Sequence, residues 1–115
     1  MFLNICEIIC RGENVTIDDL KVGTRWLEFI YPRQLIMFFV REFKLDSESG
    51  IGRFFHKSHA TVIHACKVIQ NYYDTDKIKR KEIDNYRTKI YEIKKNIELD
   101  NEFKIKYSQY ETDKV

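Results

Sequence analysis

Residues 51–66, IGRFFHKSHATVIHAC, decide the fold of this chain. A short segment with apolar residues on one side ends in the polar pair His56-Lys57, and a second periodic segment opens at Ser58. Serine is favoured at the N-terminal cap of a helix, and the apolar residues after it recur at helical spacing. The stretch therefore predicts two helices joined by a tight turn, a helix-turn-helix, whose second helix begins after Ser58.

Helical periodicity continues on both sides of this stretch. Proline suits the first turn of a helix, so Pro32 is expected to open the central helix, with residues 24–31 as a connection before it. Gly12 and Gly23 are expected to end helices, because glycine is common just after a last turn. The predicted fold class is all-α. The expected helices cover residues 2–10, a short segment capped by Thr16, residues 32–43, residues 47–55 and residues 58–73.

The C-terminal part differs in composition from the rest. We expect one domain over residues 1–74 and a charged helical extension over residues 75–115, with residues 105–115 frayed. Apolar residues recur there at spacings of three and four, a heptad-like seam that either packs back on the domain or pairs weakly with a second copy. This seam consists of Ile83, Tyr86, Ile90, Ile93 and Ile97. We expect a weak homodimer through it.

Charge and catalytic patterns narrow the function classes. The net charge is +2, yet residues 25–67 hold seven basic and four acidic side chains, so positive charge is concentrated there. The three histidines and the scattered acids form no nucleophile–base pattern. The sequence contains no Gly-x-x-x-x-Gly-Lys-(Ser/Thr) loop for nucleotide phosphates. We therefore expect neither an enzyme nor a cofactor or nucleotide.

The cysteines and the hydropathy pattern suggest where the protein resides. Cys6, Cys10 and Cys66 are an odd number, and we expect buried thiols in a reducing cytoplasm rather than disulfides. A zinc site from Cys6, Cys10 and two histidines is a less favoured alternative, because closely paired ligands are absent. No signal-peptide pattern and no apolar run of about 20 residues occurs, so we expect a cytoplasmic protein without a membrane anchor.

The start of the second predicted helix carries side chains suited to reading base edges. In a helix-turn-helix this end approaches the major groove most closely, so its side chains must be short and offer donors, acceptors or methyl groups. Ser58 could instead be only a cap, and His59 or His64 alone could be an ordinary surface or core histidine. Together the residues predict contact with duplex DNA. The candidates are Arg53, Lys57, Ser58, His59, Ala60, Thr61, His64 and Lys67.

Three motifs, in this order and spacing, resemble the C-terminal DNA-binding domain of the bacterial replication initiator DnaA: PRQ at 32–34, IGRFF at 51–55 and KSHATVIHA at 57–65. The resemblance covers about residues 4–73. It implies an all-helical, Trp-repressor-like domain whose helix-turn-helix reads an AT-rich nonamer through the major groove. It also implies that a basic residue at the start of the long helix reaches the minor groove, a role that falls on Arg33.

Several positions depart from the family pattern. The turn is one residue shorter, with His56 in place of a glycine pair, while Ser58 and Ala60 replace an acidic residue and a Ser/Thr. A different target sequence is therefore expected. Of the basic loop before the long helix only Arg25 remains, so phosphate contacts should be fewer. The residues that replace that loop's basic and polar side chains are Trp26, Leu27, Glu28 and Phe29.

Two functions follow from these patterns. The first is a stand-alone, non-catalytic, sequence-specific duplex DNA-binding protein, a replication accessory factor or transcriptional regulator of a bacterium or phage. The alternative is a protein-interaction module that modulates a host replication initiator through a patch of Trp26, Phe29 and Tyr31. Residues 1–74 hold nine basic and nine acidic side chains, which favours the alternative, whereas the retained Arg33 and residues 57–61 favour DNA.

Overall fold

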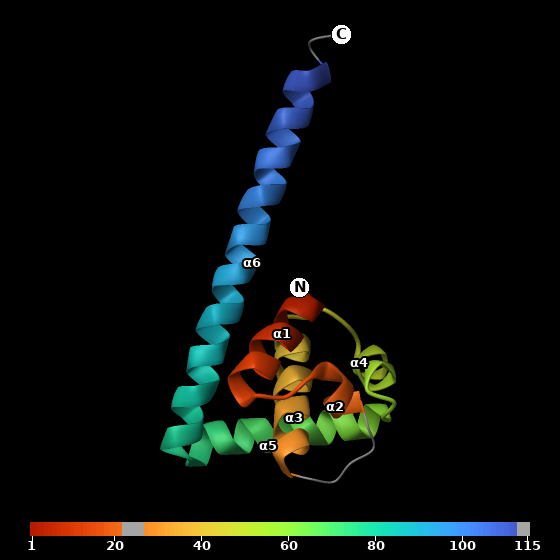
Figure 1. The fold of residues 1–115 in the computed structure, drawn as a ribbon, viewed down its shortest axis with the longest axis vertical. Helices are drawn as coiled ribbons and strands as arrows, with labels where there is room; N and C mark the ends of the chain where they lie inside the picture. The colour runs from red at the N-terminus through yellow and green to blue at the C-terminus, as the bar shows by residue number, and fades with distance from the viewer. Residues whose placement is uncertain (22–26, 113–115) are drawn as a thin grey trace.

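Within the part of the chain that the structure describes, the regular secondary structure is helical. This computed structural model describes residues 1–21 and 27–112, with side chains up to residue 104. The predicted all-α class is confirmed, and the helix-turn-helix is formed by α4 and α5 (Figure 1). The helices are α1 (Phe2–Glu13), α2 (Ile17–Lys21), α3 (Leu27–Glu42), α4 (Glu48–Phe54), α5 (His59–Thr75) and α6 (Lys77–Thr112).

Helix α3 is the centre of the domain. It contacts α1, α2, α4 and α5, and α5 crosses it (Figure 1). All residues from Leu35 to Val40 are buried, so this helix is apolar over most of its circumference. Burial of a large apolar side chain is worth about 1.5–3 kcal/mol, so α3 supplies much of the core that holds α4 and α5 in place.

Two expected helix boundaries were wrong. In the described part, α3 begins at Leu27, and Pro32 lies inside it rather than at its start. Proline lacks only one backbone N–H, and the packing of Phe29 and Tyr31 against the core keeps the preceding turn helical. Gly12 lies inside α1, which ends at Asn14 in the left-handed conformation (φ 55°).

Gly12 has a packing role instead of ending a helix. A Cβ atom at this position would collide with the ring and hydroxyl of Tyr86 on α6. Tyr86 lies against this glycine and donates a hydrogen bond from its hydroxyl to Glu13 Oε1 at 3.1 Å. Burial raises the pKa of Glu13, and this hydrogen bond partly opposes that effect. The absence of a side chain at Gly12 therefore lets α6 dock on α1.

The first half of α6 belongs to the core. Ile83, Tyr86 and Ile90 are buried against the rest of the chain, while Ile93 and Ile97 are half-buried. A homodimer through the predicted seam would require the first three to leave that core. Within the chain, the first three residues of the seam are packed on their own domain, and pairing of copies through the seam stays a prediction. Beyond the domain, α6 continues as a projecting helix (Figure 1).

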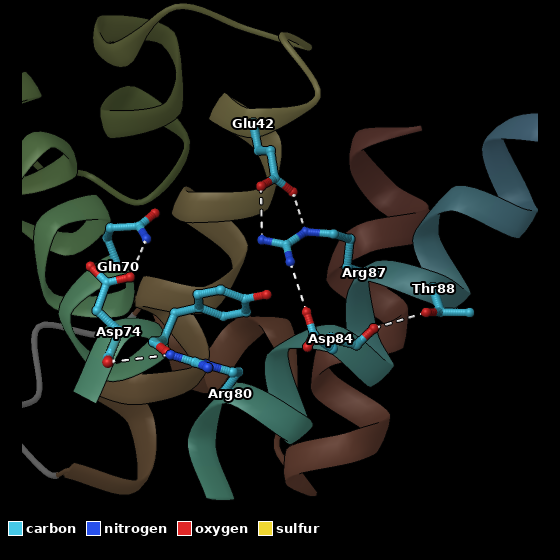
Figure 2. A network of polar contacts seen from close by, with 8 residues as sticks. Glu42, Gln70, Asp74, Arg80, Asp84, Arg87 and Thr88 are labelled. Atoms are coloured by element: carbon cyan, nitrogen blue, oxygen red, sulfur yellow. Dashed lines mark hydrogen bonds and ion pairs between the residues drawn. The ribbon is translucent and has the colours of Figure 1, made fainter. Parts of the chain in front are cut away.

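A polar network joins α6 to α3 and α5. Figure 2 shows the Arg87 guanidinium donating two hydrogen bonds to Glu42, at 3.0 and 2.9 Å, and one to Asp84 at 2.9 Å. Arg80 donates to the Tyr73 carbonyl at 2.7 Å, and both arginines stack on the Tyr73 ring at 5.2 Å. These contacts join the first half of α6 to α3 and to the end of α5.

Within the described ranges, no helix combines the length and apolarity that a membrane crossing needs. The same residues contain no group of three or more side chains placed to hold a metal ion. Cys6 and Cys66 are buried and Cys10 is half-buried, all as free thiols. Burial raises the pKa of the Cys6 thiol to about 12.

Candidate nucleic-acid interface

The turn between α4 and α5 is a compact C-terminal cap that needs one glycine. His56 takes the left-handed conformation (φ 57°), its N–H donates to the Arg53 carbonyl at 3.2 Å, and the Lys57 N–H donates to the Gly52 carbonyl at 2.8 Å. This pair of bonds is the Schellman pattern, in which glycine is the usual left-handed residue. A Cβ on Gly52 would lie 2.5 Å from the Lys57 carbonyl oxygen. Gly52 therefore permits the close approach that sets the angle between the helices.

The first turn of α5 is capped and exposed. Ser58 is the N-cap, as predicted: its Oγ accepts the Thr61 N–H at 3.4 Å and lies 3.2 Å from the Thr61 hydroxyl. Ser58, His59 and Ala60 are exposed, and Thr61 is partly exposed. The cap leaves other backbone N–H groups of the turn open to an acceptor, and the helix start carries a positive partial charge. The first turn can therefore present short polar side chains and an attractive field to an anionic surface.

The other predicted residues lie on both sides of this first turn, on α4, directly before α5 and further along α5. Arg53 is exposed on the last turn of α4, and Lys57 is half-buried directly before α5. Ala60, His64 and Lys67 are exposed at positions i, i+4 and i+7, so they follow one face of α5. Lys67 also borders a surface groove of about 420 Å³ between α3 and α5. The remaining groove residues are Phe38, Arg41, Glu42, Cys66 and Gln70.

Arg33 is not on this surface. It is 7% exposed, and its Nη1 donates to the carbonyl of Leu20, at the end of α2, at 3.3 Å. Burial lowers the pKa of its guanidinium. A side chain in this position cannot enter a groove of DNA without leaving the core, so the minor-groove role implied by the resemblance does not fit the observed position. Its neighbours Pro32 and Leu35 are buried, which places this side of α3 inside the domain.

We expect Arg33→Ala to lower the free energy of unfolding by about 1–3 kcal/mol, because the buried Leu20 carbonyl loses its partner. Urea denaturation measures this. Arg11→Ala is the matched control, since Arg11 is exposed and forms an ion pair with Glu7 on the surface. If Arg33→Ala kept the stability of the parent chain but bound DNA more weakly, this result would support the minor-groove role of Arg33.

The predicted docking patch of the alternative function consists of Trp26, Phe29 and Tyr31. Trp26 lies outside the described residues, and so does Arg25 of the basic loop. Phe29 and Tyr31 are half-buried against the core, and the Lys79 Nζ lies 4.0 Å from the centre of the Tyr31 ring. These two aromatic side chains therefore contribute to packing.

Comparison with known proteins places the helix-turn-helix in a family. The model of the bacterial dnaA protein helix-turn-helix matches residues 3–69. The chromosomal replication initiator protein DnaA of Thermoanaerobacter sp. (strain X514) is 34% identical over 86 residues, covering 75% of this chain and 19% of that protein. DnaA of Wolbachia sp. subsp. Brugia malayi (strain TRS) is 39% identical over 89 residues, covering 74% of this chain and 19% of that protein. This chain thus spans about a fifth of the length of these relatives. With its helix-turn-helix at the matching place, the chain belongs to the family of bacterial DnaA helix-turn-helix domains.

Proposed function

We propose that this chain binds duplex DNA in a sequence-specific manner and without catalysis, as a replication accessory factor or a transcriptional regulator. The observation that carries this proposal is the capped, exposed first turn of α5, held by the tight turn after α4. The family supports the same role, since the matched relatives are named chromosomal replication initiators.

The first turn of α5 would enter the major groove. Ala60 and the methyl group of Thr61 suit contact with thymine methyl groups, and the imidazole of His59 can hydrogen-bond a base edge. Lys57 and Arg53 beside this turn suit phosphate oxygens, which position a protein without reading sequence. With only a few cations near the turn, we expect moderate affinity with a modest dependence on salt.

We expect Thr61→Ala and His59→Ala each to weaken binding to a selected site by about 1–3 kcal/mol, with little change in non-specific binding. The site is first selected from a random duplex pool, and affinity is then measured by gel shift at fixed salt. Thr88→Ala is the matched control. Thr88 is exposed on α6, where its hydroxyl donates to the Asp84 carbonyl (Figure 2). If both variants keep the full preference of the parent, the first turn of α5 is not the reading surface.

A protein-interaction module is the second candidate. The balanced charge of residues 1–74, nine basic against nine acidic side chains, favours it because weak net charge gives little attraction to phosphates. The same selection separates the two functions. Enrichment of a defined duplex supports DNA binding, and a pool that stays random supports a protein partner.

A further inference from the structure

The recognition unit is free of acidic residues over a long stretch. Residues 49–73 contain no Asp or Glu, while they contain three basic residues and all three histidines of the chain. The basic residues are Arg53, Lys57 and Lys67, and the histidines are His56, His59 and His64. If every imidazole bound a proton, the formal charge of this stretch would double from +3 to +6.

The three imidazoles are placed where that charge can act. His56 is exposed in the turn between α4 and α5, His59 is exposed in the first turn of α5, and His64 is exposed one turn further on. Within the described residues, none of the three side chains forms a hydrogen bond or an ion pair. Each imidazole is therefore free to meet a ligand.

His56 occupies a position that favours glycine. Its φ of 57° lies in the left-handed region, which glycine adopts without the steric strain that a Cβ atom causes. The Schellman bonds of Arg53 and Gly52 hold it there. An imidazole therefore stands in this turn, beside the proposed DNA surface, at a position whose backbone conformation glycine would adopt without strain.

Two carboxylates on the neighbouring helices are already paired with arginines. Helices α3, α4 and α6 pack against α5. Glu48 of α4 pairs with Arg41 of α3 at 3.0 Å, and Glu42 of α3 pairs with Arg87 of α6 at 2.9 Å. These two carboxylates are thus paired with arginines rather than with the histidines. The basic groups of α6 that face α5 lie near the C-terminal end of α5, away from the turn. Lys79 lies near Tyr72, and Arg80 lies on Tyr73.

We propose that His56 is a further DNA-contacting residue and that His56, His59 and His64 make DNA binding proton-linked. The proposal rests on the proposed function. Histidine changes charge between about pH 5 and pH 8, and the field of a duplex favours the charged form. Complex formation therefore takes up protons, and by linkage lower pH strengthens binding. The ligand of protonated His56 and His64 is the phosphate backbone, so these two side chains raise affinity for selected and unrelated duplexes alike, while His59 keeps its base-edge contact.

The test measures duplex affinity by fluorescence anisotropy at pH 6.0 and pH 8.0, at equal ionic strength. For the parent chain we expect affinity about tenfold or more higher at pH 6.0, with a salt slope steeper by about 0.9 for each imidazolium that contacts a phosphate. In the variant with His56→Gln, His59→Gln and His64→Gln this pH ratio should fall to near one. His56→Gln alone should lower it measurably. Lys77→Gln, an exposed charge at the start of α6, is the control and should keep the parental ratio.

The outcomes separate this proposal from the proposed function. Duplex binding with equal affinity at both pH values, or a triple variant with the parental ratio, would overturn the proton linkage and leave DNA binding standing. A parental ratio in His56→Gln would remove His56 from the DNA surface. Absence of duplex binding at both pH values would overturn both proposals. Calorimetry in two buffers of different ionisation enthalpy counts the protons taken up and gives a second readout.

Discussion

Gly52→Ala is expected to lower the free energy of unfolding by about 2–4 kcal/mol and to abolish specific DNA binding. The added Cβ would lie 2.5 Å from the Lys57 carbonyl oxygen and 3.2 Å from the Ser58 carbonyl group. These are backbone atoms, so they cannot rotate away, and the turn must open. An opened turn changes the angle at which α5 leaves α4. Denaturation and gel shift on the same preparation measure the two effects.

Gly50→Ala is the matched control for this variant. Gly50 is buried on the same helix, but a Cβ there would meet the carboxylate of Asp46, the end of a flexible side chain. Rotation of the Asp46 side chain removes this contact, but Asp46 then loses the hydrogen bond that it accepts from the Ser47 N–H. Alanine also gains up to about 1 kcal/mol over glycine within a helix. We expect the free energy of unfolding of Gly50→Ala to differ from that of the parent chain by less than about 1 kcal/mol. Equal losses of stability in Gly50→Ala and Gly52→Ala would contradict the role assigned to Gly52.

Ile83→Ala and Ile90→Ala are each expected to lower the free energy of unfolding by about 2–5 kcal/mol. Both side chains are fully buried, and each truncation removes apolar contact and leaves a cavity between α6 and the domain. The two sites are two turns apart, so their effects should be nearly additive, and the double variant should approach the whole stability of a small domain. Leu99→Ala is the control, because Leu99 is 55% exposed on the projecting part of α6.

Sedimentation over a wide concentration range separates core packing from pairing of copies. If the seam is core, the parent chain sediments as a monomer at concentrations where it is folded, and the isoleucine variants lose stability. A parent dimer that dissociates in the isoleucine variants, without loss of stability, would show that the seam joins two chains. That outcome would require Tyr86 to leave its place against Gly12.

Local features of the recognition unit were predictable from the sequence. Ser47 and Ser58 cap α4 and α5 as expected, because a cap depends on residues only three positions away. The break between α5 and α6 lies at Asp76, three residues after the expected end of the helix at residue 73, and Asp76 Oδ1 accepts the N–H groups of Ile78 and Lys79. The polar pair His56-Lys57 also predicts the turn between the two helices, because the apolar periodicity is interrupted there.

The sequence by itself determined the all-helical class, the helix-turn-helix and the family, since these depend on helical periodicity, nearby caps and a contiguous motif. Only the tertiary structure decided that Arg33 is buried under α2, that Gly12 receives Tyr86, and that the start of α6 completes the core. These features depend on partners far apart in the chain; the Tyr86–Glu13 hydrogen bond spans 73 positions. A heptad-like stripe has the same sequence whether it faces a second copy or its own domain, and only the tertiary structure shows that Tyr86 of this stripe fills the space beside Gly12 on α1.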